Sequence, residues 1–369
     1  MSEPDYETAR LTVRLDAIVA NYRLCQRLIG PAAVAGVVKA DAYGLGAEPV
    51  SRALAAAGAD TFFVARLEEG VRLRKVLPDA RIYVLDGAAP DTVPALLSHR
   101  LTPVLNSLAE IAGWNAAAQS TRSQLECAIH IDTGMSRLGL PGEELSRLAA
   151  DHKKRLEGLR VVLWVSHLAC ADDPEAKMNR VQLDRFKTAL AMLPPAPASL
   201  ASSGGVLLGK DYAFDTVRPG IGVYGGNVQN APQNPFQVAA VLSGRVLQLR
   251  RIDRGDSVGY GATYRAKRPT VIATVALGYA DGLMRAIGNR GVAAIAGARA
   301  PVVGRVSMDL VTLDASEVPA EALSTDAVAE FFGDTIALDD VARAADTAAY
   351  EILTAIAPRV PRHYRGQAS

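Results

Sequence analysis

The sequence has few cysteines and no cysteine pattern typical of a metal or redox site. Cys25, Cys127 and Cys170 are the only three cysteines among 369 residues, and no two of them form a C-x-x-C motif. An odd number of cysteines at wide spacing does not predict a disulfide framework or a zinc site. We therefore expect reduced, structural thiols and no bound metal.

Long apolar runs and an excess of one charge are also absent. No apolar run approaches the length that spans a bilayer, and the first ten residues, MSEPDYETAR, lack the basic start and apolar core of a signal peptide. Forty basic and 39 acidic residues give a formal net charge of +1. Without a long run of one sign, neither nucleic acid nor a membrane surface is expected as a partner. We expect a cytoplasmic protein with a small-molecule ligand.

The first two-thirds of the chain alternate apolar, β-rich runs with longer amphipathic stretches rich in alanine and leucine. This pattern is typical of parallel strands joined by crossover helices. Eight strands are predicted, at residues 34–39, 61–65, 82–85, 102–105, 128–132, 162–167, 199–202 and 216–218. Because eight such strands close a (β/α)8 TIM barrel, we predict an α/β fold with this barrel over residues 11–230.

The composition changes after about residue 230. Short β-branched runs broken by Gly, Asp and Pro replace the helical periodicity. This change predicts a C-terminal all-β domain over residues 231–369, with the Asn-, Gln- and Pro-rich residues 227–235 as the junction. Residues 1–10 precede the barrel and are expected to join this second domain.

Several polar residues follow predicted strands at the end where barrel active sites lie. Lys39 ends the first strand, with Tyr43 in its loop, Arg137 follows the fifth strand, and His167 ends the sixth. A lysine at this place is partly buried, which lowers its pKa and prepares the amine for Schiff-base and proton-transfer chemistry. Each residue alone also has a structural explanation, such as a surface lysine or a core histidine. Their shared position favours one active site.

The loops after the seventh and eighth strands contain SLASSGGV and TVRPGIGVYGG. Barrels commonly bind phosphate through these loops, although glycine-rich turns are the structural alternative. Ser203, Gly204, Gly220 and Ile221 supply a hydroxyl and backbone amides for an anion. A lysine amine and a phosphate site at one barrel mouth suggest pyridoxal 5′-phosphate as the cofactor.

Eight motifs occur in order along the chain: VVKADAYGLG at residues 37–46, DTGMSRLG at 132–139, SHLACAD at 166–172, VRPGIGVYG at 217–225, SVGYGATY at 257–264, GYADG at 278–282, VGRVSMD at 303–309 and AAYEIL at 348–353. Through these motifs the sequence resembles the alanine racemases, which are fold-type III pyridoxal-phosphate enzymes, over essentially its whole length. The resemblance implies an isomerase that interconverts L-alanine and D-alanine and supplies D-alanine for cell-wall peptidoglycan.

The resemblance also implies two bases. Lys39 would bind the cofactor covalently and act on one face of the substrate Cα, and Tyr260 would act on the opposite face. Racemisation requires such a pair, because one base removes the proton and the other returns one with inverted stereochemistry. A phenol with a pKa near 10 is a poor base unless a cation stabilises its phenolate. The resemblance assigns Arg137 and His167 to that polar network.

The family's remaining contacts are implied at matching positions. Cofactor contacts are implied for Tyr43, His167, Ser203, Arg218, Gly220, Ile221 and Tyr350, and substrate contacts for Arg137, Met308, Tyr279 and Asp309. Arg218 would donate to the pyridine nitrogen, and because arginine stays protonated, the ring would be a weaker electron sink that favours racemisation. The family's tyrosine base comes from a second subunit, so Tyr260 implies a head-to-tail homodimer with shared active sites.

Three positions depart from the family pattern. His130 stands where many relatives have a lysine, often carbamylated, so that Arg137 would be oriented by a chloride or water or held differently. Ser202 replaces a common asparagine, and Ser307 a common cysteine.

Three alternatives remain open. One is a broader racemase acting on serine or basic amino acids, whose bulk would have to pass Tyr279. Another is a decarboxylase of the same architecture, against which Arg218 argues. The third is a regulatory, non-enzymatic barrel, but such relatives usually have a single domain.

Overall fold

The apolar runs of the first two-thirds form a ring of parallel strands in the computed structural model, which describes residues 7–229, 231 and 233–366. The strands are β2 (Ala33–Val34), β3 (Gly36–Val37), β4 (Thr61–Val64), β5 (Arg81–Val84), β6 (Thr102–Leu105), β7 (Leu125–His130), β8 (Leu159–Val165), β9 (Ala198–Ser199) and β10 (Thr216–Val217). Strands β3 to β9 pair in chain order, and β10 pairs with β2. The Arg218 N–H donates to the Ala201 carbonyl at 2.8 Å. This hydrogen bond joins the segment after β10 to the segment after β9. The predicted (β/α)8 barrel is confirmed.

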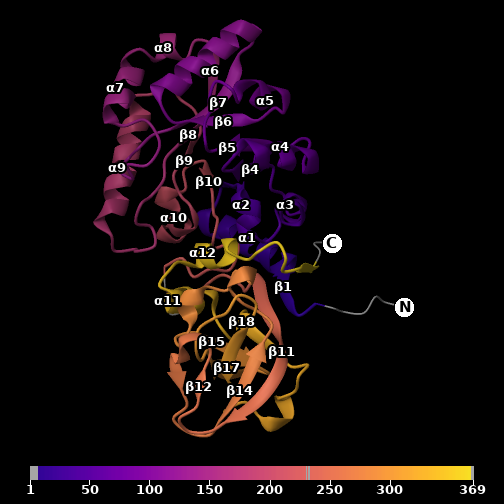
Figure 1. Ribbon diagram of the computed structural model, residues 1–369. Helices are drawn as coiled ribbons and strands as arrows, with labels where there is room; N and C mark the ends of the chain where they lie inside the picture. Colours follow the sequence, from indigo (N-terminus) through magenta and orange to yellow (C-terminus); the bar gives the residue numbers. More distant parts are fainter. Residues whose placement is uncertain (1–6, 230, 232, 367–369) are drawn as a thin grey trace.

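Helices cover the outside of this ring (Figure 1). They are α1 (Leu15–Ile29), α3 (Ala47–Ala56), α4 (Leu67–Val76), α5 (Val93–Ser98), α6 (Leu108–Thr121), α7 (Gly142–Ala150), α8 (His152–Arg155), α9 (Lys177–Ala191) and α10 (Ser203–Leu208). In α1 the apolar residues Ile18, Tyr22, Cys25 and Ile29 recur at helical spacing and are buried. The amphipathic pattern of α1 therefore places one of its faces against the protein interior. All three cysteines are free.

The second domain is built on an eight-stranded sheet (Figure 1). Its strands are β1 (Ala9–Arg14), β11 (Ala240–Ile252), β14 (Thr270–Val275), β15 (Val292–Ile295), β16 (Ala298–Pro301), β17 (Val311–Asp314), β18 (Val328–Phe332) and β19 (Arg362–Arg365), with the hairpin β12 (Ser257–Val258) and β13 (Tyr264–Arg265) apart from the sheet. The domain is mostly β rather than all-β, because it also contains α11 (Leu338–Ala345) and α12 (Ala349–Thr354). In α11 the residues Val341, Ala342 and Ala345 form a buried face, which is a helical and not a strand period.

The chain begins in the second domain and then enters the barrel. Strand β1 pairs antiparallel with β11 and parallel with β19, and α1 follows it directly. Residues 1–6 and 367–369, and positions 230 and 232 of the predicted junction, lie outside the described residues. One buried apolar cluster includes residues from both domains, such as Leu11 and Val13 with Phe62 and Leu242. The domains are therefore packed on a shared core.

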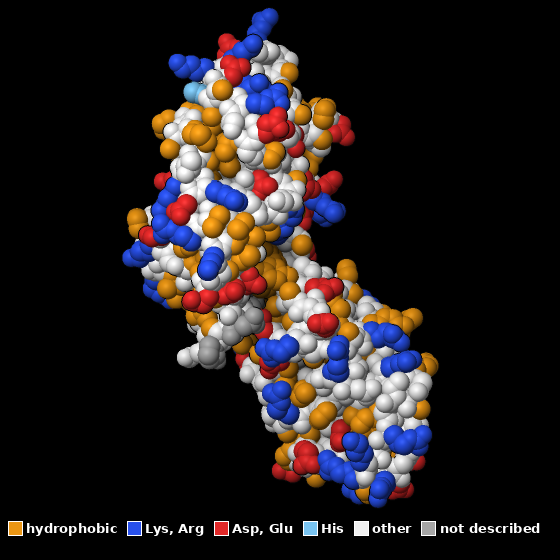
Figure 2. Space-filling model, turned by 90° about the vertical axis from the view of Figure 1, so that its left-hand side faces the viewer, with side chains coloured by type: hydrophobic (Ala, Val, Ile, Leu, Met, Phe, Trp, Pro, Cys, Tyr) orange, Lys and Arg blue, Asp and Glu red, His pale blue; other side chains and the backbone are white. Residues whose placement is uncertain are grey.

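The surface has two lobes joined at a narrower waist, with acidic and basic side chains interspersed over both (Figure 2). Among the helices that the structure describes, none has the length and apolar character needed to cross a membrane.

Candidate active site

A cavity of about 260 Å³ opens at the carboxyl ends of the barrel strands. Its lining includes Lys39, Tyr43, Arg137, His167, Ser203, Arg218, Gly220, Ile221 and Tyr350. All nine were singled out in the sequence, and eight of them follow barrel strands. Tyr350 comes instead from α12 of the second domain, which reaches the barrel mouth (Figure 1).

Lys39 does not continue the first barrel strand, as the predicted strand over residues 34–39 implied. Strand β3 ends at Val37, and Ala40, Asp41 and Ala42 have φ values of 52°, 54° and 51°. This left-handed turn costs non-glycine residues about 1–2 kcal/mol each. Tertiary contacts must therefore hold the turn against its local preference.

Two carboxylates supply those contacts. The Ala40 N–H donates to Oε1 of Glu69 at 2.6 Å, and Asp41 Oδ1 accepts from the Ala47 N–H at 2.7 Å. Glu69 also accepts from two amides at the start of α4, at residues 65 and 66. The turn is thereby fixed to its neighbouring helices, and Lys39 stays at the barrel mouth.

The Lys39 amine is prepared for reaction by its surroundings. Burial lowers its pKa, the charges of Arg137 and Arg218 lower it further, and Glu69 and Asp86 oppose this effect. A lowered pKa raises the fraction of neutral amine, which is the nucleophilic and basic form.

A second group of lining residues presents hydrogen-bond donors, and we call Tyr43, Ser203, Gly220, Ile221 and Tyr350 the anion end. Ser203 Oγ accepts from the Gly220 N–H at 2.8 Å, so its own proton is free to be donated. Over the part of the chain that the structure describes, the Tyr43 hydroxyl and the Ile221 N–H have no hydrogen-bond partner. A Cβ at Gly220 would lie 2.1 Å from the Tyr43 hydroxyl, so only glycine fits there. These donors suit a bound phosphate.

Arg218 is a buried residue of the cavity wall and contacts residues of β9 and of the segment after β8. Its guanidinium donates to the Ser166 carbonyl at 2.6 Å and to Ser199 Oγ, and it lies 5.8 Å from the Phe63 ring centroid. Burial lowers its pKa to about 10, so it remains a cation at neutral pH.

His167 accepts from Arg218 through its Nδ1 at 3.5 Å, since a guanidinium only donates. Burial and the charges of Arg218, Arg137 and Lys39 lower the pKa of His167 to about 3. Its imidazole is therefore neutral at pH 7.

Arg137 lies on an exposed loop that Asp132 holds in place. The Asp132 carboxylate accepts from the N–H groups of Gly134 and Met135, both at 2.9 Å, and from Ser136. His130 lies at the end of β7 beneath this loop and also lines the cavity.

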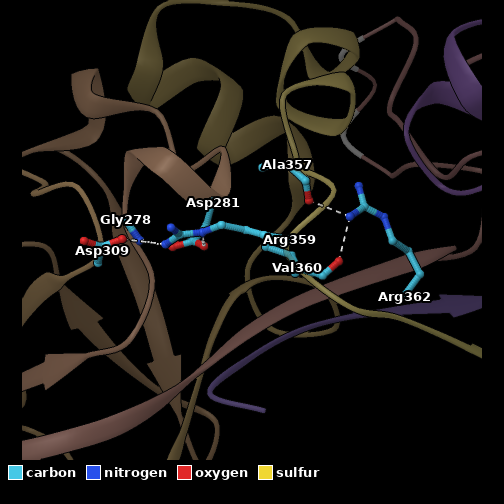
Figure 3. A network of polar contacts seen from close by, with 7 residues as sticks. All are labelled: Gly278, Asp281, Asp309, Ala357, Arg359, Val360 and Arg362. Carbon is cyan, nitrogen blue, oxygen red and sulfur yellow. Dashed lines mark hydrogen bonds and ion pairs between the residues drawn. The ribbon is translucent and has the colours of Figure 1, made fainter. Parts of the chain in front are cut away.

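Four predicted site residues lie away from this cavity, on the second domain. Tyr260, Tyr279 and Met308 are 72%, 43% and 55% exposed. Asp309 pairs with Arg359, whose guanidinium also contacts Asp281, both at 2.6 Å (Figure 3). One chain therefore supplies the barrel half of the predicted site and displays the other half on its surface.

Sequence reasoning missed Phe63 and Asp86, which line the cavity, and Asn106, whose Oδ1 lies 2.9 Å from Nδ1 of the lining residue His130. Asp86 and Asn106 each follow a correctly predicted strand, so the rule that located Lys39 and His167 could have found them. Phe63 lies inside β4, where an apolar run gives no sign that one ring faces the cavity.

Comparison with known proteins gives concordant results. The family profile described as "Alanine racemase, N-terminal domain" matches residues 13–228, and "Alanine racemase, C-terminal domain" matches residues 239–364. The alanine racemase of Rhodospirillum rubrum is 46% identical over 99% of this chain and 98% of its own length. That of Rhizobium meliloti is 44% identical over the whole of both chains.

Solved structures agree with these sequence matches. Alanine racemase from Bartonella henselae, with covalently bound pyridoxal phosphate, superposes with a TM-score of 0.93 at 38% identity over 97% of this chain and all of its own. Biosynthetic alanine racemase from Pseudomonas aeruginosa gives a TM-score of 0.92 at 35% identity, over 98% of this chain and all of its own.

Proposed function

Because this chain belongs to the alanine racemase family, we propose that the cavity at its barrel mouth binds pyridoxal 5′-phosphate and is where L-alanine and D-alanine are interconverted. The observation that carries this assignment is a lysine amine of lowered pKa in one cavity with the anion end. When bound, the cofactor supplies an electron sink for the pair left on the substrate Cα after proton removal.

The residues present fit this cofactor. Lys39 offers the amine for covalent attachment, and the anion end offers the unpartnered Tyr43 hydroxyl, the Ser203 proton and the Ile221 N–H to the phosphate. We assign the neutral His167 to the contact with the cofactor ring. Gly220 leaves the space that the Tyr43 hydroxyl needs.

Arg218 sets the protonation of the cofactor nitrogen in this proposal. Three of its N–H groups contact protein acceptors, which leaves two of its five donors for the pyridine nitrogen. A group that stays a cation cannot pass its proton to that nitrogen. Arg218 would therefore leave the bound cofactor a weaker electron sink, which would favour return of the proton to the substrate over side reactions.

The proton on Cα is moved by two bases. Lys39 serves one face from the barrel, and we assign the opposite face to Tyr260. Since Tyr260 is exposed on the second domain and does not line its own chain's cavity, it would reach the cavity of a second copy. The proposal is thus a head-to-tail homodimer with two shared sites.

The substrate contacts follow the same division. Arg137, from the barrel, would receive the substrate carboxylate together with Met308 of the partner subunit. Tyr279 and Asp309 of the partner subunit would narrow the entrance and limit substrate size. We divide the chain functionally into the cofactor-binding barrel, residues 11–230, and the domain that supplies these partner residues, 231–369 with 1–10.

The biological assignment is D-alanine supply for peptidoglycan by a cytoplasmic enzyme. The relatives compared above are named alanine racemases, and none of them supports the alternative of a broader racemase for serine or basic amino acids.

Chiral analysis tests the function directly. Purified, cofactor-loaded protein is incubated separately with L-alanine, L-serine, L-lysine and L-arginine while carbon dioxide is monitored. D-alanine should form far faster than any other product. Comparable D-serine or D-lysine would contradict the narrow specificity, and carbon dioxide without D-product would contradict the assignment of Arg218.

A further inference from the structure

Two loops of the second domain, residues 278–282 and 307–309, lie side by side, and we call them the entrance loops. The Tyr279 N–H donates to the Ser307 carbonyl at 3.0 Å, and the next N–H along the chain donates to the Met308 carbonyl at 2.9 Å. These bonds join the backbone of one loop to that of the other. The entrance loops carry the side chains that were assigned above to the entrance of the partner subunit's cavity.

A third segment contacts both loops through one side chain, Arg359 (Figure 3). Its Nε donates to Oδ1 of Asp281 in the first loop, and its Nη2 donates to Oδ1 of Asp309 in the second loop, both at 2.6 Å. A planar guanidinium can hold two carboxylates in fixed directions, whereas a lysine ammonium is a single point charge. Arg359 therefore joins side chains of the two loops in addition to their backbone bonds.

The two ion pairs differ in burial. The Asp281 side chain is only 7% exposed and also accepts from the Gly278 N–H at 2.8 Å, so its position is fixed, whereas Asp309 is 56% exposed. An exposed ion pair alone contributes little, because the ordering of two side chains offsets their attraction. Here the buried carboxylate already orders Arg359, so the second arm of the guanidinium is in place for Asp309.

The segment that carries this arginine follows α12 and is held against the barrel of its own chain. The Ala357 N–H donates to the Asp281 carbonyl at 3.0 Å. Arg362 donates to the carbonyls of Ala357 and Val360, both at 2.6 Å, and to that of Gly44 at 3.2 Å (Figure 3). Gly44 ends the left-handed turn after β3. The entrance loops are thus tied through this segment to a fixed part of the molecule.

We propose that Arg359 is a positioning residue for the entrance to the partner subunit's cavity: it holds the entrance loops, and with them Tyr279 and Asp309, at the spacing that limits substrate size. The inference rests on the proposed function, because it takes these two residues as entrance residues of a shared site. Release of Asp309 from Arg359 removes the side-chain link between the loops. The entrance should then admit a larger amino acid.

The ratio of kcat/KM for L-2-aminobutyrate to kcat/KM for L-alanine tests this in the cofactor-loaded enzyme. Arg359→Met should raise the ratio about tenfold, because one methylene group is discriminated by about this factor. Arg359→Lys keeps a cation for the buried Asp281 and so protects the fold, but it cannot hold both carboxylates as a guanidinium does, and the ratio should rise here too. Arg180→Met, which removes an exposed ion pair on α9, is the matched control and should keep the wild-type ratio. No rise in the folded Arg359 variants would overturn the proposal.

A double-mutant cycle separates positioning from a general loss of stability. If Arg359 acts through Asp309, then Arg359→Lys should not raise the ratio further in an Asp309→Ala background. An equal rise in both backgrounds would contradict the proposal.

Heterodimers show which cavity Arg359 serves. A heterodimer of one Lys39→Ala chain and one Tyr260→Phe chain has a single intact site, in the barrel of the Tyr260→Phe chain. Arg359→Lys in the Lys39→Ala chain, which supplies the entrance loops to that site, should raise the ratio. The same substitution in the Tyr260→Phe chain should leave it unchanged, and the reverse pattern would refute the proposal.

Ligand binding gives the same comparison without turnover. Propionate and butyrate are alanine and 2-aminobutyrate without the amine, and calorimetry on the cofactor-loaded protein gives their Kd values. Arg359→Lys should shift the ratio of Kd values in favour of butyrate while the visible spectrum of the cofactor stays unchanged, and an unshifted ratio would count against the proposal. Absence of racemisation by the wild type would overturn the proposed function, whereas failure of the Arg359 inference alone would leave wild-type racemisation intact.

Discussion

At the scale of single residues, the cavity is a cluster of cations held among neutral histidines. Lys39, Arg137 and Arg218 all contribute positive charge, and both His130 and His167 have lowered pKa values. Such a cluster is poorly satisfied by the protein alone. A ligand with a phosphate and a carboxylate would supply the missing negative charge.

Lys39→Ala tests covalent attachment. Without the amine, the protein should retain pyridoxal phosphate only weakly and lose the visible absorbance of a lysine-bound cofactor. Absorption spectra of the dialysed variant and wild type are the measurement. Lys153→Ala, at an exposed position in α8, is the matched control and should keep the wild-type spectrum. An unchanged spectrum in Lys39→Ala would disprove the assignment.

Arg218→Glu tests the control of the cofactor nitrogen. A carboxyl group can leave that nitrogen protonated, which strengthens the electron sink and should raise transamination relative to racemisation. Product analysis for pyruvate and D-alanine gives the ratio. Arg218→Lys keeps a cation and serves as the control. The same ratio in the wild type and Arg218→Glu would contradict the argument.

The two histidines predict an acid-sensitive apoprotein. Their ordinary pKa of 6.5 is lowered to about 3 in His167 and about 4 in His130. The unfolded chain regains the ordinary value and binds more protons below it, so stability must fall as the pH drops from about 7 to about 5. Thermal unfolding of the apoprotein should show a lower Tm at the lower pH. The decrease in Tm with pH should be smaller in His167→Asn than in the wild type. An equal decrease in the two proteins would show that His167 is not a cause of the acid sensitivity.

At the scale of elements, the most distinctive one is the left-handed turn after β3. Ala40 is exposed and has φ 52°, a region that glycine enters without the cost that a Cβ imposes. Ala40→Gly should therefore leave stability unchanged or raise it by up to about 1 kcal/mol. Ala116→Gly in the middle of α6 is the control and should lower it by about 1 kcal/mol. Denaturant unfolding measures the stability of both variants. Equal losses of stability in Ala40→Gly and Ala116→Gly would contradict strain in the turn.

The elements also show what the sequence could predict. All eight barrel strands were predicted near their observed places, because buried parallel strands are continuous apolar runs between turns. The left-handed turn was not predicted, since KADAY has ordinary helical propensity and the contacts that hold the turn, such as that of Glu69, form only in the folded structure. Helix α11 was missed because its short amphipathic pattern lies between β-rich runs.

The site was predictable to a similar extent. Lys39, Arg137 and His167 follow from position after strand ends, and the family motifs supplied Arg218 and, from a distant helix, Tyr350. The Asn106–His130 contact was not predictable, because the orientation of an amide depends on its three-dimensional neighbours. Sequence thus located the chemistry better than the contacts that orient it.

At the scale of the whole molecule, the second domain presents two separate sets of side chains, one in the cavity of its own barrel and one on the surface. Its helix α12 contributes Tyr350 to the anion end of its own barrel. The ring centroids of Tyr350 and Tyr43 are 6.0 Å apart. Its sheet region displays Tyr260, Tyr279 and Met308 to solvent. The exposure of these apolar side chains in one chain is explained if a second copy of the chain covers them in the dimer.

Subunit complementation tests the shared site most directly. Lys39→Ala and Tyr260→Phe homodimers should each be nearly inactive in racemisation. Mixing, unfolding and refolding them together in equal amounts should give heterodimers with one intact site, and thus about a quarter of wild-type activity. If both bases came from one chain, the mixture would regain nothing beyond the sum of the two variants, and the account of a site shared between subunits would be wrong.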